Sequence, residues 1–448
     1  MKTKTLLALG LLLALVSLSF NLDPVYPFRA ATCSDPLVAD MLNLTSQTQW
    51  ADWVEKLSGA EPVTIGGASY TISTRHTRYM ATGAANAKAL PFVLEQITNW
   101  AGDVSQIERD SYQLSISGTL YTTENLILEL PGTGRMATTS VILSAHLDST
   151  SPATSSNAPG AEDNASGSAA LLEAARTLRH YRFSRDLRII WFTGEEQGLK
   201  GSLAYVGDHS PNNIYGVVNL DMYGYDSNND HCFELHVGTM PQSAVVGQCF
   251  TQGIDAYDID LNYDYLTTSA EGYSDHETFW NYNVGAVEVL ENYSNQGIAG
   301  GCVGADENPY YHTINDRIQY MNLPSGFEIT KAGIAAAANL AGPLGPCFSN
   351  GNAPQMGNDP FVLSWTAMPG AAKYRIYKSS QGCEGTFTRV AETSSTQWQD
   401  AQLPAGQSAS YQVEAVAGAD SGYCISFLSP CQVLTAPYQV FLPAISNE

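Results

Sequence analysis

Strands that alternate with helices along residues 138–224 constrain the fold of this chain more than any other feature. A buried strand is indicated by the apolar run in TTSVILSAHLD, and a helix by the Ala/Leu spacing in SGSAALLEAARTLRHY. The alternation continues with a strand in RDLRIIWFTGEE, a helix in LKGSLAYVGDH and a strand in IYGVVNLDMYG. Strands apolar on both faces that alternate with helices predict an α/β fold, with a doubly wound, mostly parallel sheet flanked by helices.

Further segments extend the pattern in both directions. Apolar residues at helical spacing that end at a glycine occur in QTQWADWVEKLSG and in AANAKALPFVLEQITNWAG. Strands are predicted in TENLILELPG, CFELHVG and VGAVEVLEN. Doubly wound sheets carry their chemistry at the carboxyl ends of the strands, so residues that follow the strands are the first candidates for a functional site.

The composition changes at residues 344–360, where the segment LGPCFSNGNAPQMGNDP is rich in Gly, Pro and Asn. Such a segment is typical of a linker, and helical periodicity does not return after it. Short strands with an early Trp365 and a late Tyr411 indicate a small all-β sandwich that resembles a fibronectin type III module. We therefore expect a first domain at 33–345, a linker at 346–358, a β-sandwich at 359–436 and a C-terminal tail at 437–448.

The N-terminus, MKTKTLLALGLLLALVSLSF, has lysines, then an apolar run, then small residues, which is the pattern of a secretory signal peptide. We place this signal peptide at residues 1–25. A membrane anchor is the alternative, but the apolar run from Leu6 to Val16 is shorter than the ~20 residues that a span needs. The mature protein is expected to be extracellular and to have no membrane span.

Cysteine content and charge agree with an exported protein. Eight cysteines in an exported chain favour disulfide bonds, and we expect Cys232 to pair with Cys249 and one pair to form within the tail domain. The formal net charge of −23 argues against nucleic acid or an anionic membrane as partner, because both select basic surfaces. We expect a monomer whose C-terminal module binds a surface or a polymer.

Histidines and acidic residues follow the buried strands. They are His146 and Asp148 after VILSA, Asp163 in the next loop, Glu195 and Glu196 after RIIWF, Asp221 after YGVVNL, and His312 in PYYHTINDR. Individually, Asp163 could cap the helix that begins near Ser166, and Asp221 could simply end a strand. Together, two histidines and several carboxylates at one edge of a sheet form a ligand set suited to zinc.

Five motifs of this chain resemble those of the secreted bacterial aminopeptidases with two zinc ions, the leucyl aminopeptidase type. The motifs are SAHLDS, GAEDNASGSAALLE, FTGEEQGLKGS, NLDMYG and YYHTINDR, and the resemblance covers roughly residues 70–340. It implies that the first domain is a zinc peptidase domain, with peptides as substrates and two Zn²⁺ per chain.

The resemblance also implies a role for each motif residue. One zinc ion would be bound by His146 and Asp221, the other by Glu196 and His312, and Asp163 would bridge both. Two further residues would act without binding metal. Glu195 would be the general acid/base that takes a proton from a metal-activated water and passes it to the leaving amine. Asp148 would accept a hydrogen bond from His146 and fix its tautomer.

One departure from the family pattern concerns the Ser-Asp-His triplet at residues 274–276. In the family, a disulfide-closed loop presents a tyrosine just before this triplet, whereas the preceding TSAEGY contains Tyr273 but no cysteine. His276 is also a rival to His312 as a metal ligand, and the motif HTINDR favours His312.

Three other functions remain open at this point. A carboxypeptidase or dipeptidase on the same fold would need a basic residue that faces the terminal carboxylate of the substrate. Glutaminyl cyclase shares the fold and uses one zinc ion, which the complete set of five ligands disfavours. A non-catalytic binding protein on this scaffold would be expected to have lost ligands, and none is missing here.

Overall fold

The computed structural model describes residues 33–134, 136–298, 301–348 and 353–437, and these belong to one compact unit. The predicted signal peptide at 1–25 lies outside the described residues, as does most of the predicted tail at 437–448. In the described part of the chain, no helix has both the length and the apolar character needed to cross a membrane.

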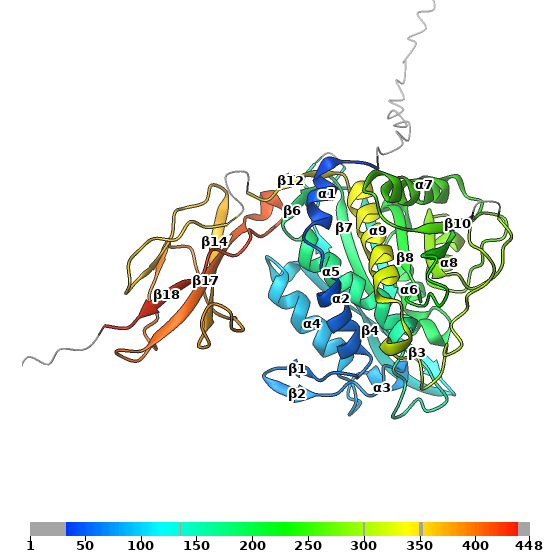
Figure 1. Cartoon of the computed structure of the whole chain (residues 1–448), viewed down its shortest axis with the longest axis horizontal. Coiled ribbons are helices and arrows are strands. Elements are labelled where there is room, and N and C mark those ends of the chain that lie inside the picture. Colours follow the sequence, from blue (N-terminus) through cyan, green and yellow to red (C-terminus); the bar gives the residue numbers. More distant parts are fainter. Residues whose placement is uncertain (1–32, 135, 299–300, 349–352, 438–448) are drawn as a thin grey trace, which may run out of the picture. The chain divides into compact units, whose positions relative to one another are not determined.

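Eight strands of the described residues form one mixed sheet, shown in Figure 1. Their spatial order is β10 (Asn262–Leu266), β9 (Cys232–His236), β11 (Ala286–Glu291), β8 (Ile214–Leu220), β5 (Ser140–His146), β7 (Asp186–Phe192), β4 (Thr119–Leu130) and β3 (Ile107–Ile116). The pairs β10/β9, β11/β8, β5/β8 and β5/β7 are parallel. The pairs β11/β9, β4/β7 and β3/β4 are antiparallel. The predicted α/β fold is therefore confirmed, with parallel strands at its centre.

Helices cover both faces of this sheet (Figure 1). One face carries α1 (Pro36–Leu42), α2 (Gln47–Leu57), α4 (Ala89–Trp100), α5 (Gly167–Leu178), α7 (Pro241–Ala256) and α9 (Leu323–Ala341). The other face carries α6 (Lys200–Asp208) and α8 (His276–Asn281). Alternate residues of β5 serve the two cores: Val141 and Leu143 pack with the larger set of helices, and Ile142 with α6 and α8. This double burial explains why the central strands are apolar throughout.

Shorter elements complete the α/β region. They are β1 (Val63–Ile65), β2 (Ala68–Tyr70), α3 (Thr77–Met80), β6 (Tyr181–Phe183) and β12 (Pro343–Pro346). The strands β1 and β2 form one antiparallel pair, and β6 and β12 form another. The second pair lies where the chain leaves α9 and approaches the C-terminal region.

The C-terminal residues form an additional β region with its own core. The four strands β15 (Thr388–Thr393), β14 (Ala371–Ser379), β17 (Ser408–Ala417) and β18 (Gln432–Thr435) make an antiparallel sheet, and β13 (Leu363–Ser364) pairs with β16 (Gln397–Trp398). Trp365 and Tyr411, the two aromatic residues noted in the sequence, lie in the core of this region. The likeness to fibronectin type III and the domain boundaries stay predictions.

All eight cysteines form disulfide bonds: Cys33–Cys249, Cys232–Cys302, Cys347–Cys424 and Cys383–Cys431. The predicted Cys232–Cys249 pair is wrong. The end of β9 that carries Cys232 faces the loop at Cys302, whereas α7 presents Cys249 to the N-terminal segment at Cys33. The expected pair within the tail region is present as Cys383–Cys431.

The C-terminal β region packs directly against the α/β region. The Arg375 side chain, which is buried, donates hydrogen bonds to the carbonyl oxygens of Ala101 and Gly102, just after α4. A Cβ atom at Gly102 would lie 1.7 Å from the Tyr423 carbonyl oxygen, so only glycine permits this approach. The same contact zone contains the Cys347–Cys424 disulfide.

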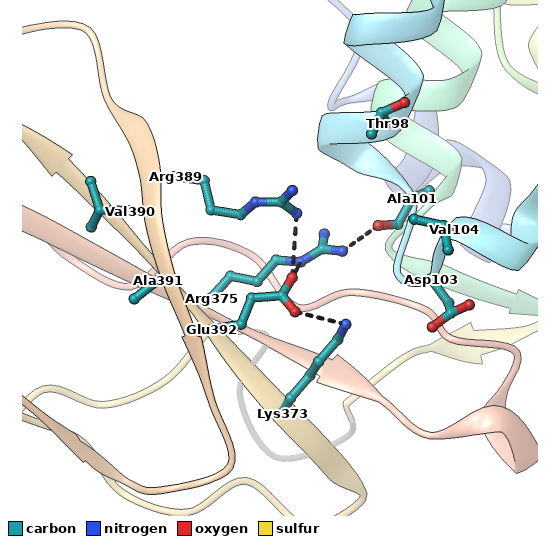
Figure 2. A pocket seen from close by; sticks show the side chains of 10 residues that line it. All are labelled: Thr98, Ala101, Asp103, Val104, Lys373, Arg375, Arg389, Val390, Ala391 and Glu392. Carbon is teal, nitrogen blue, oxygen red and sulfur yellow. Dashed lines mark hydrogen bonds and ion pairs between the residues drawn. The ribbon is translucent and has the colours of Figure 1, made fainter.

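A pocket of about 420 Å³ opens beside this contact, and Figure 2 shows its lining. Three cationic side chains enter it from β14 and β15, namely Lys373, Arg375 and Arg389. Glu392 accepts a hydrogen bond from each of them, at 2.9, 2.9 and 3.3 Å respectively. Glu392 and Asp103 together offset two of these three positive charges, and none of the strand-end residues singled out above lines the pocket.

Candidate metal centre

The strand-end residues predicted from the sequence meet at one edge of the sheet. Because β5, β7 and β8 are parallel neighbours, their carboxyl ends lie side by side. His146 is the last residue of β5, Asp221 follows β8, and the two glutamates form a short 3-10 turn (Glu195–Gln197) after β7. Loops supply Asp163, from the turn before α5, and His312, from the segment before α9.

Five of these side chains form two groups that share one carboxylate. In the first group, His146 Nε2 lies 3.2 Å from Asp163 Oδ1 and 2.9 Å from Asp221 Oδ1. In the second, His312 Nε2 lies 3.1 Å from Asp163 Oδ2 and 3.0 Å from Glu196 Oε2. Asp163 therefore offers one oxygen to each group, which is the arrangement of a bridging ligand.

Crowding and burial make this site unfavourable for anions alone. Burial, with the neighbouring charge of Asp163, raises the pKa of Glu196 to about 7. Burial also raises the pKa of Glu195 well above its ordinary value, and Asp221 and Asp275 add to this rise. The Glu196 Oε1 atom is buried and has no hydrogen-bond partner. Cations placed between these carboxylates would remove the repulsion and satisfy that oxygen.

The donor chemistry fits zinc. Each group combines one imidazole nitrogen with two carboxylate oxygens, and both donor types are common in zinc sites. A catalytic zinc site usually has three protein ligands and leaves a position for water or substrate, and each group has three donors. The second group is also reachable from solvent, since the His312 side chain is 39% exposed.

Glu195 and Glu196 are adjacent in sequence but differ in placement. Only Glu196 belongs to a ligand group. Glu195 lies outside both groups, and its backbone N–H donates to Asp148 Oδ1 at 3.2 Å. Glu195 nevertheless stands beside the site, since its neighbour Glu196 belongs to the second group and Asp148, which its N–H contacts, follows His146 by two residues. This separation allows one glutamate to bind metal and the other to exchange protons.

Asp148 contacts His146 in a different way from that expected. The His146 Nδ1 atom lies 3.0 Å from the backbone carbonyl oxygen of Asp148 and 3.7 Å from its carboxylate Oδ1. The carboxylate instead accepts hydrogen bonds from the Thr77 hydroxyl, at 2.6 Å, and from the Glu195 backbone. Asp148 thus orients the imidazole through its main chain and the turn at Glu195 through its side chain.

The rival ligand His276 lies outside both groups. His276 is the first residue of α8, and its Nε2 atom lies 2.9 Å from the Glu271 carbonyl oxygen and 3.3 Å from Glu288 Oε2. Burial lowers the pKa of His276 to about 3, so its ring is neutral near pH 7. Tyr273, which precedes the triplet, is 80% exposed, and Asp275 is fully buried.

Three residues near the site were not identified from the sequence. The Tyr311 ring stacks on His312 with centroids 3.8 Å apart, and burial together with Asp163 raises the pKa of its phenol. Asp316 and Arg75, both buried, bond to the backbone around Asp163. Tyr311 and Asp316 belong to the YYHTINDR motif, which could have directed attention to them, whereas the segment around Arg75 carries no such signal.

Comparisons with known proteins agree with this geometry. Residues 125–337 match the model described as Peptidase family M28. The "Probable leucine aminopeptidase 2" of Arthroderma benhamiae is 27% identical over 230 residues, which cover 49% of this chain and 45% of that protein. The match therefore spans less than half the length of that curated relative.

Two solved structures share the fold. The LapA aminopeptidase of Legionella pneumophila has a TM-score of 0.52 at 21% identity, covering 69% of this chain and 73% of that one. A glutaminyl cyclase from an Acidobacteriales bacterium has a TM-score of 0.51 at 16% identity, covering 66% and 94%. Identities this low show a common fold only. Residues 125–337 are thus similar to Peptidase family M28, and the curated relative that matches about half of this chain is named a leucine aminopeptidase.

Proposed function

We propose that this protein is an extracellular aminopeptidase that binds two zinc ions and removes single, preferably apolar, residues from the free N-terminus of peptides. The observation that carries the proposal is the placement of Asp163, whose two carboxylate oxygens face His146 and His312 separately. With Asp221 and Glu196, these residues would hold the two ions. When bound, the zinc ions would activate a water molecule and polarise the peptide carbonyl.

Glu195 is the proposed general acid/base. It stands beside the ligand groups without belonging to either, so its carboxylate is free to take a proton from the attacking water. It would then donate that proton to the amine that leaves. The pKa of Glu195 is raised by burial, and a raised pKa brings a carboxyl group closer to the range in which it exchanges protons near neutral pH.

Asp148 and Tyr311 would also support this chemistry. A hydrogen bond from His146 Nδ1–H to the Asp148 carbonyl leaves His146 Nε2 unprotonated and directed at Asp163 and Asp221. The phenol of Tyr311 stays protonated, because burial and the site carboxylates raise its pKa, and it can donate a hydrogen bond to a substrate oxygen.

The charges around the site favour an aminopeptidase over a carboxypeptidase. A substrate carboxylate would need a cationic side chain with free N–H groups. Arg75 is near, but it is fully buried and donates to the carbonyl oxygens of Leu57, Leu147, Pro159 and Gly160. A protonated N-terminal amine would instead meet the carboxylate-rich site directly.

Glutaminyl cyclase is the second candidate, because the fold is shared with such an enzyme. The division of Asp163 between two histidines favours two metal ions over one.

We also propose that residues 1–25 direct export, in keeping with cysteines that are all paired. The sandwich at 359–436 is proposed to be a separate domain after the linker at 346–358.

The test combines metal analysis with a panel of aminoacyl chromogenic substrates and N-acetylated controls. Protein purified without chelators is expected to contain two zinc ions per chain and to cleave only substrates with a free amine. Equal cleavage of free and N-acetylated peptides would refute the aminopeptidase. One zinc ion with full activity on N-terminal glutamine peptides would favour the cyclase.

A further inference from the structure

Resting on the two-zinc site proposed above, we propose that Asp316 is a positioning residue that fixes the bridging carboxylate of Asp163 and thereby couples the two metal sites. Asp316 is a member of neither ligand group and was not assigned a role from the sequence. Its place in the structure nonetheless connects the two loops on which the bridge depends.

Asp316 holds the backbone of the bridging residue by two hydrogen bonds. Its Oδ1 accepts from the Glu162 N–H at 2.9 Å, and its Oδ2 accepts from the Asp163 N–H at 3.0 Å. Its own carbonyl oxygen accepts a third bond, from the Ala161 N–H at 3.1 Å. Three consecutive N–H groups of the turn are thus fixed by one residue, and this turn is non-helical at Asp163.

The position of Asp316 in the chain explains why these three hydrogen bonds matter for both ligand groups. It follows His312 by four residues, in the loop that supplies a ligand to the second group. One loop therefore provides both a ligand and the support for the bridging carboxylate. A shift of this loop would move His312 and Asp163 together, and through Asp163 it would also disturb the first group.

Arg75 holds the same turn from its other end. It donates to the Gly160 carbonyl at 2.8 Å and to the Leu147 carbonyl, next to His146, also at 2.8 Å. Gly160 has φ +50°, and a Cβ atom there would lie 2.2 Å from the Asp163 carbonyl oxygen. The turn is therefore tightly confined, so the backbone from which the Asp163 carboxylate projects is fixed.

The test is Asp316→Asn in the full chain, followed by removal of zinc with a chelator and titration with zinc against a chromogenic indicator. Asparagine keeps the shape, but its amide nitrogen cannot accept the hydrogen bond that one Oδ atom accepts, so one of the two side-chain bonds is lost. We expect both zinc ions to bind ~10–100-fold more weakly, the usual effect of removing such a support. Asn315→Ala, an exposed neighbour in the same loop, is the matched control and should retain wild-type affinity.

The outcomes separate this inference from the proposed function. Wild-type protein that binds only one zinc ion would refute the two-zinc site itself. Two ions in the wild type and unchanged affinity in a folded Asp316→Asn variant would refute the role of Asp316 alone. Weakening of a single ion would mean that Asp316 acts on His312 and not on the bridge.

A second variant covers the case in which Asp316→Asn does not fold. Asp316→Glu keeps two acceptor oxygens on a longer side chain, so zinc affinity should be lower than in the wild type but should not be lost. A folded Asp316→Glu variant with wild-type affinity would overturn the proposal. Failure of both variants to fold would also overturn it, because Asp316 would then be a requirement of the fold.

Discussion

Glu195 and Glu196 should respond in opposite ways to the same substitution. In Glu195→Gln, the backbone N–H that bonds to Asp148 is kept, and no ligand group loses a member. The fold and both zinc ions should therefore be retained, while proton transfer is lost. General acid–base catalysis typically contributes ~10²–10⁴-fold, so kcat should fall by that factor, or about 2.7–5.4 kcal/mol in activation free energy.

Glu196→Gln removes a carboxylate whose Oε2 lies 3.0 Å from His312 Nε2. A neutral amide replaces one of the three donors of the second group, whereas the first group keeps all of its members. We expect this variant to retain the zinc ion at His146 and to bind the other weakly, so that metal content falls from two towards one per chain.

The assay is zinc content, measured beside kcat on an aminoacyl chromogenic substrate. Gln197→Ala, at the next position of the same turn and outside both ligand groups, controls for a general effect on the turn. Loss of zinc from Glu195→Gln, with two ions retained in an inactive Glu196→Gln, would show that the two roles are reversed. Similar, small effects of both substitutions would show that the pair is only a solvated acidic surface.

Three further predictions concern the C-terminal region and pH. Arg375→Met removes the ion pair with the buried Glu414 and the hydrogen bonds to Ala101 and Gly102, but the charge of Arg179 still acts on Glu414. It should cost ~1.5–3 kcal/mol and lower Tm by roughly 2–3 °C at ~2.1 cal/mol/K per residue, with zinc content unchanged; an unaltered Tm would contradict this. Burial lowers the pKa of His180 to about 3, so below pH ~6.5 the unfolded state binds a proton that the folded state does not. The free energy of unfolding should therefore decrease as the pH is lowered below that value, by at most ~1.36 kcal/mol per pH unit from this group. In unfolding free energies measured from pH 7.5 to 4.5, His180→Gln should make this decrease shallower. A chain ending at Leu344 keeps every proposed ligand, so it should bind zinc and turn over small substrates. Its Tm should be lower because the contacts of the C-terminal β region, such as Arg375 with Ala101, are lost. A truncated chain that folds but binds no zinc would show that the metal site depends on the C-terminal β region.

The central sheet and the strand-end residues could be predicted because their signals are local. Strands β5, β7 and β8 are apolar on both faces, and the polar residues after each strand stand out against that background. Parallel strands then place those residues at the same edge, which follows from topology alone. The pairing of Asp163 with both histidines went beyond the residue pattern and depended on the family resemblance.

Other parts of the structure leave no such signal. The helix α9 is buried almost all round and rich in alanine, so it lacks the polar face that makes helical periodicity visible. Strand β3, at the edge of the sheet, is largely polar. The disulfide Cys33–Cys249 joins residues 216 apart, and spacing cannot predict such a pair. Arg75 owes its place to carbonyl groups from several distant segments.

The disulfide Cys347–Cys424 has a consequence for what proteolysis would do to the C-terminal region. It closes a loop of the chain with a sequence separation of 77, so one peptide-bond cut anywhere inside that loop leaves two fragments joined covalently. Cys383–Cys431 overlaps this loop, so a cut between residues 383 and 424 is bridged twice. A nicked molecule would migrate as one species on a gel until a reductant is added, and Arg375 would remain beside Ala101.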